Sequence, residues 1–231
     1  MNFNEQQIKS NLQRITDTLL INGGFLDNSG LYTGEMGLVL FFFHYARFTQ
    51  NELFSDYGFE LIEKVQNRIH EGTLINYQDG LTGIGSTIEY LVQNGFIEAD
   101  TDDILEDFDK RIFFTCNLSR LPIEEIKDVG YYAAWRISGN SKHKDMIRQD
   151  VQQYTDIPNL RLKKHTCLVE KSFSHCLELI DQNKFWNKDF GFQNGLASWG
   201  MFLLTELNGD NSWISLLAND FIPLKNESLP V

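Results

Sequence analysis

The glycine-rich stretch Gly30-Leu31-Tyr32-Thr33-Gly34-Glu35-Met36-Gly37 decides the fold, and it runs directly into the apolar residues Leu38 to Phe43. A second copy leads into another apolar run and reads Gly80-Leu81-Thr82-Gly83-Ile84-Gly85. A third, less complete copy reads Gly195-Leu196-Ala197-Ser198-Trp199-Gly200, and a copy around Gly130 has lost most of its glycines. Aligned on glycines 30, 80, 130 and 195, the copies are 50, 50 and 65 residues apart. Such self-similarity is typical of an array of supersecondary units.

Helical periodicity dominates the rest of the chain. Apolar residues recur at steps of three and four, as in Ile8, Leu12, Ile15 and Leu19, and this spacing places them on one face of a helix. Polar-faced helices are expected over residues 4–20, 52–71, 102–116 and 141–156. Each precedes a glycine-opened apolar helix, expected over 34–48, 83–95, 129–138 and 196–208, and 160–182 is expected to form one more helix. No run alternates with the period of two that indicates a strand. The sequence therefore predicts a single all-α domain over residues 1–231, built as an array of helical hairpins.

Composition narrows the function classes. Hydrophobic residues make up 42% of the 231 residues, which suffices for a large core. The net charge of −12 argues against nucleic acid as a partner, because phosphate binding needs clustered Lys and Arg. No basic, then apolar, signal segment opens the chain, and the apolar run that ends at His44 is too short to span a membrane. Three widely spaced cysteines fit reduced thiols, so a cytoplasmic location is expected.

The repeated motifs resemble those of the lanthionine synthetase C-like family of α/α-toroid proteins. The resemblance rests on the Gly-Leu-x-x-Gly-x-x-Gly pattern at 30–37, on Asp79 to Gly85 followed by Tyr90-Leu91, and on Asn194 to Ala197. It implies two rings of helices that alternate along the chain, with a site on the axis near the starts of the inner helices. It also implies cyclase chemistry, in which zinc held by cysteine and histidine helps to close thioether rings in peptides.

This chain departs from the zinc pattern that the resemblance implies. Gln193 and Asn194 stand where a Cys-His pair is expected, and Asp128 and Val129 stand where the other cysteine is expected. Carboxamides and carboxylates do not replace thiolates in a zinc site without changing its chemistry. We therefore expect no metal and no other cofactor at these positions. The chain also has fewer helix pairs than a complete toroid of this family, so the ring is expected to be open, or completed by another chain such as a second copy in a homodimer.

The sequence leaves two interpretations open for each of two further sets of residues. Cys167, His175 and Cys176 either bury as core residues or form a metal site. The carboxylates at or near the starts of the apolar helices, Glu35, Asp79, Asp128 and Asp189, either cap helices, which the helix dipole favours, or act as paired carboxylates on the axis.

The aromatic residues allow a similar choice, because most of them can fill the core while some, such as Trp199, can line an axial cleft that grips a peptide. The candidate cleft residues share a position at or near the start of an apolar helix, and they are Glu35, Asp79, Asp128, Gln193, Asn194 and Trp199. The leading hypothesis is a non-catalytic relative of the cyclases that binds a peptide or a partner enzyme during the maturation of a peptide natural product. The alternative is a zinc-independent enzyme, peptide-modifying or carbohydrate-active, that uses the axial carboxylates.

Overall fold

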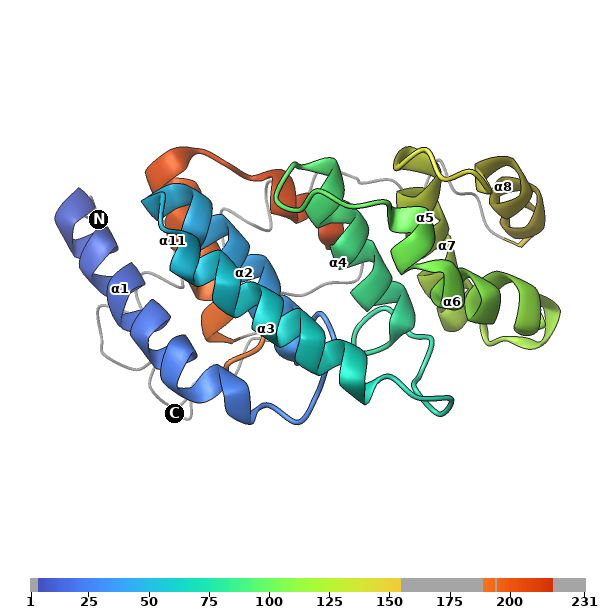
Figure 1. Ribbon diagram of the computed structural model, residues 1–231, viewed down its shortest axis with the longest axis horizontal. Coiled ribbons are helices and arrows are strands. Elements are labelled where there is room, and N and C mark those ends of the chain that lie inside the picture. Colours follow the sequence, from blue (N-terminus) through green and yellow to red (C-terminus); the bar gives the residue numbers. More distant parts are fainter. Residues whose placement is uncertain (1–3, 155–188, 194, 218–231) are drawn as a thin grey trace, which may run out of the picture.

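The computed structural model describes residues 4–154, 189–193 and 195–217, and this part of the chain is helical and contains no strand. The predicted all-α fold is confirmed (Figure 1). The longer helices are α1 (Glu5–Asn22), α2 (Glu35–Thr49), α3 (Glu52–Arg68), α4 (Leu81–Gln93), α7 (Ile123–Ser138), α8 (Lys144–Gln152) and α11 (Leu196–Asn208). The shorter ones are η1 (Gly23–Phe25), α5 (Thr101–Ile104), α6 (Glu106–Asp109), the π-helix η2 (Lys110–Thr115), η3 (Leu118–Arg120) and η5 (Ser212–Leu216).

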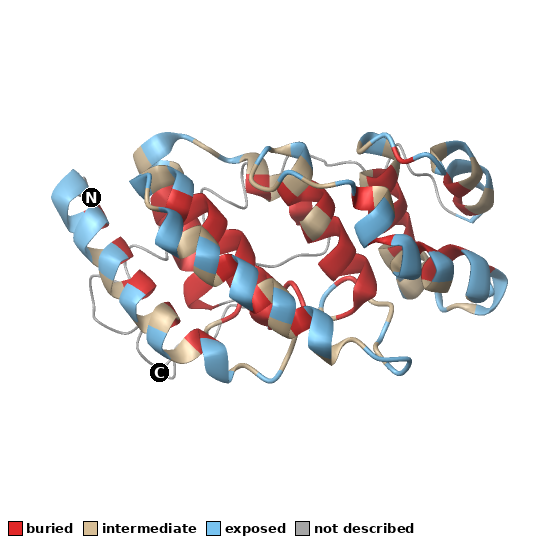
Figure 2. Cartoon of the chain, viewed as in Figure 1, coloured by how far each residue is buried: buried red, intermediate tan, exposed pale blue. Residues whose placement is uncertain are grey.

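The helices pack as neighbouring pairs in an array. α2 packs along α3, α4 packs against α7, and α7 packs against α8. Helix α11 contacts both α1 and α2, so it lies beside the first helices of the chain although it is far from them in sequence (Figure 1). The inner helices α2, α4 and α11 are buried over most of their surface, whereas α1 and α3 bury one face each (Figure 2).

Local sequence explains where the outer helices begin and which face they bury. The side chain of Asn4 accepts a hydrogen bond from the backbone of Gln6, and Gln7 bonds back to Asn4, which closes a capping box at the start of α1. Asn51 caps α3 in a similar way. The four apolar residues that the periodicity singles out in α1 are all buried, so its predicted face is confirmed.

Two predicted helices differ from the structure. The apolar helix expected to start near Gly130 is α7, which begins at Ile123, directly after Pro122. Proline suits a helix start because its φ is already helical and its missing N–H leaves no donor unpaired. The helix expected over 102–116 is broken at Leu105, which leaves helical geometry. Two pairs of acidic residues four positions apart span this break, Asp102 with Glu106 and Asp103 with Asp107. Such like-charge pairs weaken a helix.

Three inner helices begin at a glycine with almost the same extended backbone. Gly34 has φ −120° and ψ −165°, Gly80 has −117° and −167°, and Gly195 has −111° and 175°. A Cβ at each of them would come within 3.0 Å of the carbonyl oxygen six residues earlier, which belongs to Asn28, Leu74 and Asp189 respectively. Glycine is required here because the loop folds back tightly against the helix start, and not because φ is positive.

We predict that Gly83→Ala destabilises the fold by about 1–3 kcal/mol, since its Cβ would collide with the backbone carbonyl of Tyr77 inside a packed core. Chemical denaturation of the purified variant measures this loss. Gly24→Ala is the matched control, because its Cβ would lie 4.0 Å from the nearest atom, the hydroxyl oxygen of Tyr57. Equal stability of the two variants would contradict the tight packing described here.

Candidate functional site

The loops that precede α2, α4 and α11 share one hydrogen-bond pattern. In each loop the first amide of the helix donates to the carbonyl seven residues earlier: Glu35 to Asn28 at 2.9 Å, Leu81 to Leu74 at 2.9 Å, and Leu196 to Asp189 at 2.8 Å. The recurrence shows that the glycine signature encodes one structural unit, a folded-back loop that opens an inner helix.

This pattern corrects the register of the sequence repeat. The structurally equivalent glycines are Gly34, Gly80 and Gly195, which are 46 (80 − 34) and 115 (195 − 80) residues apart. Gly30 lies four residues before its cap, in the position that Asn76 has in the second loop. Gly130 lies inside α7 and opens no helix. The spacing of 50 residues was therefore wrong, because two different glycines of the first motif were available for alignment.

The three loops are joined edge to edge by their backbones. The amide of Tyr32 donates to the carbonyl of Gln78 at 2.9 Å, and the amides of Phe192 and Gln193 donate to the carbonyl of Tyr32 at 2.7 and 2.6 Å. We call residues 28–34, 74–80 and 189–193 the loop platform. It lies at the N-terminal ends of α2, α4 and α11, and its exposed residues include Thr33 and Gln78.

The predicted cleft carboxylates have separate partners. Glu35 is fully buried, and its two oxygens lie 2.7 Å from Lys64 Nζ and 3.0 Å from an Arg68 nitrogen, both on α3. Asp79 accepts hydrogen bonds from the hydroxyl of Thr33 at 2.7 Å and from its amide at 3.3 Å. Glu35 thus fastens the start of α2 to α3, and Asp79 joins two loops of the platform to each other.

The remaining candidates occupy different environments. Asp128 lies within α7, not at its start, because that helix begins at Ile123. Gln193 is half-buried on the platform, and Asn194 lies outside the described residues. Trp199 is fully buried in the core, so its predicted place in an open cleft was wrong. Its position in the first turn of a helix that is buried nearly all round explains this burial.

The metal hypothesis for Cys167, His175 and Cys176 falls outside the described residues. Within the part that is described, no three His, Cys, Asp or Glu side chains lie close enough together to hold a metal ion. No helix in that part is long and apolar enough to cross a membrane.

A buried series of side-chain hydrogen bonds, which the sequence did not predict, links α2, α4 and the segment after α11. His44 is 2% exposed; its Nε2 lies 2.8 Å from the Tyr90 hydroxyl and its Nδ1 lies 3.3 Å from an Asp210 carboxylate oxygen. The Tyr90 hydroxyl also lies 2.6 Å from Ser212 Oγ. The sequence contains one signal for these hydrogen bonds, namely a histidine, His44, that directly follows the apolar run Leu38 to Phe43.

The chemistry of these groups fixes the direction of the hydrogen bonds. A carboxylate only accepts, so Nδ1 of neutral His44 donates to Asp210 and Nε2 accepts from Tyr90. The Tyr90 oxygen then accepts from the Ser212 hydroxyl. Burial lowers the pKa of His44, against the opposing effect of Asp210. The hydrogen bond from His44 lowers the pKa of Asp210 in turn, and burial raises the pKa of Tyr90.

A second buried cluster lies on α7. The Arg136 side chain is fully buried and pairs with Asp102 at 2.6 Å, with Asp109 at 2.7 Å and with Glu89. Tyr132 also donates to Asp109 at 2.7 Å. One guanidinium thus ties α4, α5 and α6 to α7, and its removal would leave carboxylates buried without their cation.

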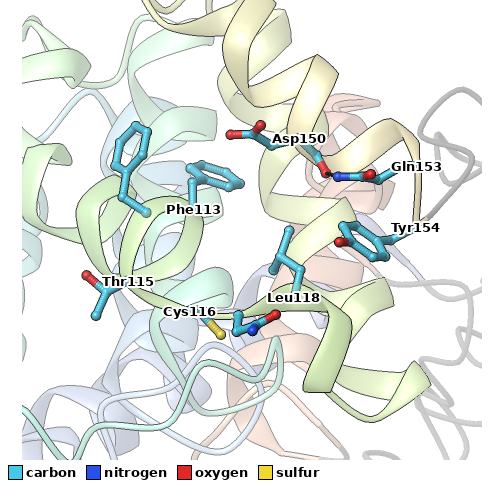
Figure 3. A pocket seen from close by; sticks show the side chains of 9 residues that line it. Phe113, Thr115, Cys116, Leu118, Asp150, Gln153 and Tyr154 are labelled. Atoms are coloured by element: carbon cyan, nitrogen blue, oxygen red, sulfur yellow. Dashed lines mark hydrogen bonds between the residues drawn. The ribbon is translucent and has the colours of Figure 1, made fainter.

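A pocket of about 380 Å³ lies between η2, η3 and α8 (Figure 3). Phe113, Leu118 and Tyr154 supply apolar walls, and Asp150 and Cys116 lie at its border. Burial raises the pKa of the Cys116 thiol, with a smaller contribution from Glu125. The reactive thiolate is therefore disfavoured, and Cys116 is a poor nucleophile.

Comparisons with protein-family models, with curated proteins and with solved structures found no match to this chain.

We predict that His44→Gln removes part of the pH dependence of stability between about pH 7.5 and 5. In the unfolded chain His44 binds a proton near pH 6.5, but in the folded chain its pKa is lower, so lowering the pH through this range favours unfolding. Asp210 does not contribute in this range, because its pKa is lowered from a value already near 3.8. Thermal unfolding at several pH values measures the slopes, and equal slopes for the variant and the wild type would contradict the buried neutral histidine.

We predict that Arg136→Met destabilises the fold by about 3–5 kcal/mol, since it leaves buried carboxylates unpaired. Arg148→Met is the matched control, because Arg148 is half-exposed and its ion-pair partner among the described residues is the exposed Asp145. Urea unfolding of both variants measures the difference. A loss at Arg136 no larger than the loss at Arg148 would show that the cluster does not hold α4 and α7 together.

Proposed function

We propose that this protein is a non-catalytic, peptide-binding relative of the lanthionine synthetase C-like proteins, with their α/α-toroid architecture. On this proposal it binds a peptide substrate, or the peptide-modifying enzyme that carries it, during the maturation of a peptide natural product. The observation that carries the proposal is the loop platform, in which three glycine-capped loops are joined side by side at the starts of the inner helices. The resemblance places the family's site at this end of the inner helices.

The residues at the platform support binding rather than zinc chemistry. With the corrected register, the residues directly before the capping glycines are Thr33, Asp79 and Asn194. None of them is a cysteine or histidine, so they do not fit the thiophilic zinc site that the resemblance implies. Thr33 and Asp79 bind each other instead. The exposed carboxamide of Gln78 offers a donor and an acceptor of the kind that an extended peptide backbone requires.

The alternative, an enzyme that uses axial carboxylates, finds less support. Glu35 is fully buried and held by two cations of α3. A general acid or base has to reach the reacting group within hydrogen-bond distance, and a buried ion pair does not allow this. The ion pairs of Glu35 and the hydrogen bond from Thr33 to Asp79 thus favour a structural role for both carboxylates.

The test uses a fluorescently labelled peptide that contains dehydroalanine and cysteine, mixed with the purified chain with and without added zinc. We predict that fluorescence anisotropy detects binding and that mass spectrometry after thiol alkylation finds every cysteine still free. The variant Gln78→Lys changes an exposed platform side chain and is expected to weaken binding about tenfold, which corresponds to about 1.4 kcal/mol. Gln66→Lys makes the same change on an exposed position of α3 and is expected to bind like the wild type.

Two results would reject the proposal. Loss of free thiols in the presence of the chain would make it a cyclase. Absence of binding at high micromolar protein would remove dehydrated peptides as its ligand class. Equal weakening by both lysine variants would mean that charge, and not the platform, governs binding.

A further inference from the structure

The segment that follows α11 leaves the hairpin pattern and crosses the inner helices. We call residues Asp210–Leu217 the strap. It begins after Gly209, whose φ of 73° is left-handed and ends α11, and it contains the short helix η5. In Figure 1 the chain runs from the end of α11 to the neighbourhood of α4, and η5 contacts α4.

The middle of the strap is anchored by apolar side chains. Trp213 is fully buried, and its ring lies 5.5 Å from that of Phe192 and 5.3 Å from that of Phe202, both in edge-on geometry. Its indole nitrogen donates to Thr205 Oγ1 at 2.9 Å. Leu216 and Leu217 are also buried. Aromatic pairs of this kind add about 0.5–1.5 kcal/mol to the effect of area burial.

Polar groups of the inner helices hold one end of the strap, and a tyrosine of the loop platform holds the other. At one end His44 and Tyr90 bind the side chains of Asp210 and Ser212. At the other end the hydroxyl of Tyr77 donates to the backbone carbonyl of Leu216 at 3.0 Å. We call the residues that hold the strap the strap seat: His44, Tyr77, Tyr90, Phe192 and Phe202.

The strap seat has the composition of a peptide-binding surface. It combines aromatic rings with polar groups at its two ends, which is how ligand sites fix orientation. His44, Tyr77 and Tyr90 are each at most 2% exposed, and a buried polar group without a partner costs about 1–3 kcal/mol. The seat therefore requires an occupant with matching groups. Gly209 separates the strap from α11, so the strap is not itself a member of a helical hairpin.

We infer that the strap seat is a peptide-recognition surface that the chain's own strap covers, and that it accepts a second peptide of the same chemistry. This peptide carries a carboxylate, a hydroxyl group two residues later, an aromatic ring three residues later, and aliphatic side chains six and seven residues later, as Asp210, Ser212, Trp213, Leu216 and Leu217 do. The inference rests on the proposed peptide-binding function, and it adds the surface, the side-chain pattern and a competing internal occupant.

The test removes the central anchor from the strap and supplies it in a separate peptide. The probe is a fluorescein-labelled peptide with the sequence of residues 210–217, and the protein is the full chain with Trp213→Ala. This variant keeps every residue of the seat but leaves a space that only an aromatic side chain fills. We expect it to bind the probe at least about tenfold more tightly than the wild type does, since in the wild type the strap competes. A probe with alanine at the tryptophan position is the matched control and is expected to lose this gain.

A milder variant keeps the test decisive if Trp213→Ala does not fold. Ser212→Ala removes one anchor of the strap without creating a large cavity, and it too is expected to bind the probe more tightly than the wild type. No gain in affinity with the folded variants would overturn the inference. The dehydrated peptide is then added as a competitor: if the probe binds but the competitor does not displace it, the seat stands and only the proposed ligand class fails.

Discussion

The absence of a side chain at three helix starts is the constraint on which the rest of the structure depends. At Gly34, Gly80 and Gly195 a Cβ would occupy the space of a carbonyl oxygen six residues earlier. Without it, each loop folds back until its carbonyls accept the first free amide of the helix. A helix start that would otherwise need water or a side-chain cap is thus satisfied by backbone alone, and it can be buried.

Buried helix starts explain the sequence of the inner helices. Because their loops need no water, α2, α4 and α11 can be surrounded by other elements and can be apolar on almost every face. The few polar groups within them are then costly unless they are paired, and several of these pairings reach another part of the chain. His44 and Tyr90 reach the strap, Glu35 reaches α3, and Glu89 reaches Arg136 on α7. These few polar side chains of the inner helices therefore fix the positions of the strap, α3 and α7.

The sequence predicted the fold class well and the site less well, for physical reasons. Helical periodicity and recurring glycines depend on local geometry, so the all-α array and the glycine-opened helices at Glu35, Leu81 and Leu196 follow from them. The predicted alignment of the glycine motifs was wrong because Gly30 and Gly34 both match the motif. Only the fold distinguishes a glycine that caps a helix from one that lies within the loop. The hydrogen bonds that link His44 to Tyr90 and Asp210 could not be predicted, because they join residues that only tertiary packing brings together. Trp199 carried no mark that separates a core aromatic residue from a cleft residue.

Amide hydrogen exchange tests the central claim most directly, namely that the glycine-capped loops hold the inner helices as one cooperative unit. The informative amides are those of Glu35, Leu81 and Leu196, which bond within each loop, and those of Tyr32 and Phe192, which bond between loops. The account predicts that all five exchange only by global unfolding, with the same free energy of opening. An amide pair in one loop that opens at a clearly lower free energy than the others would contradict it.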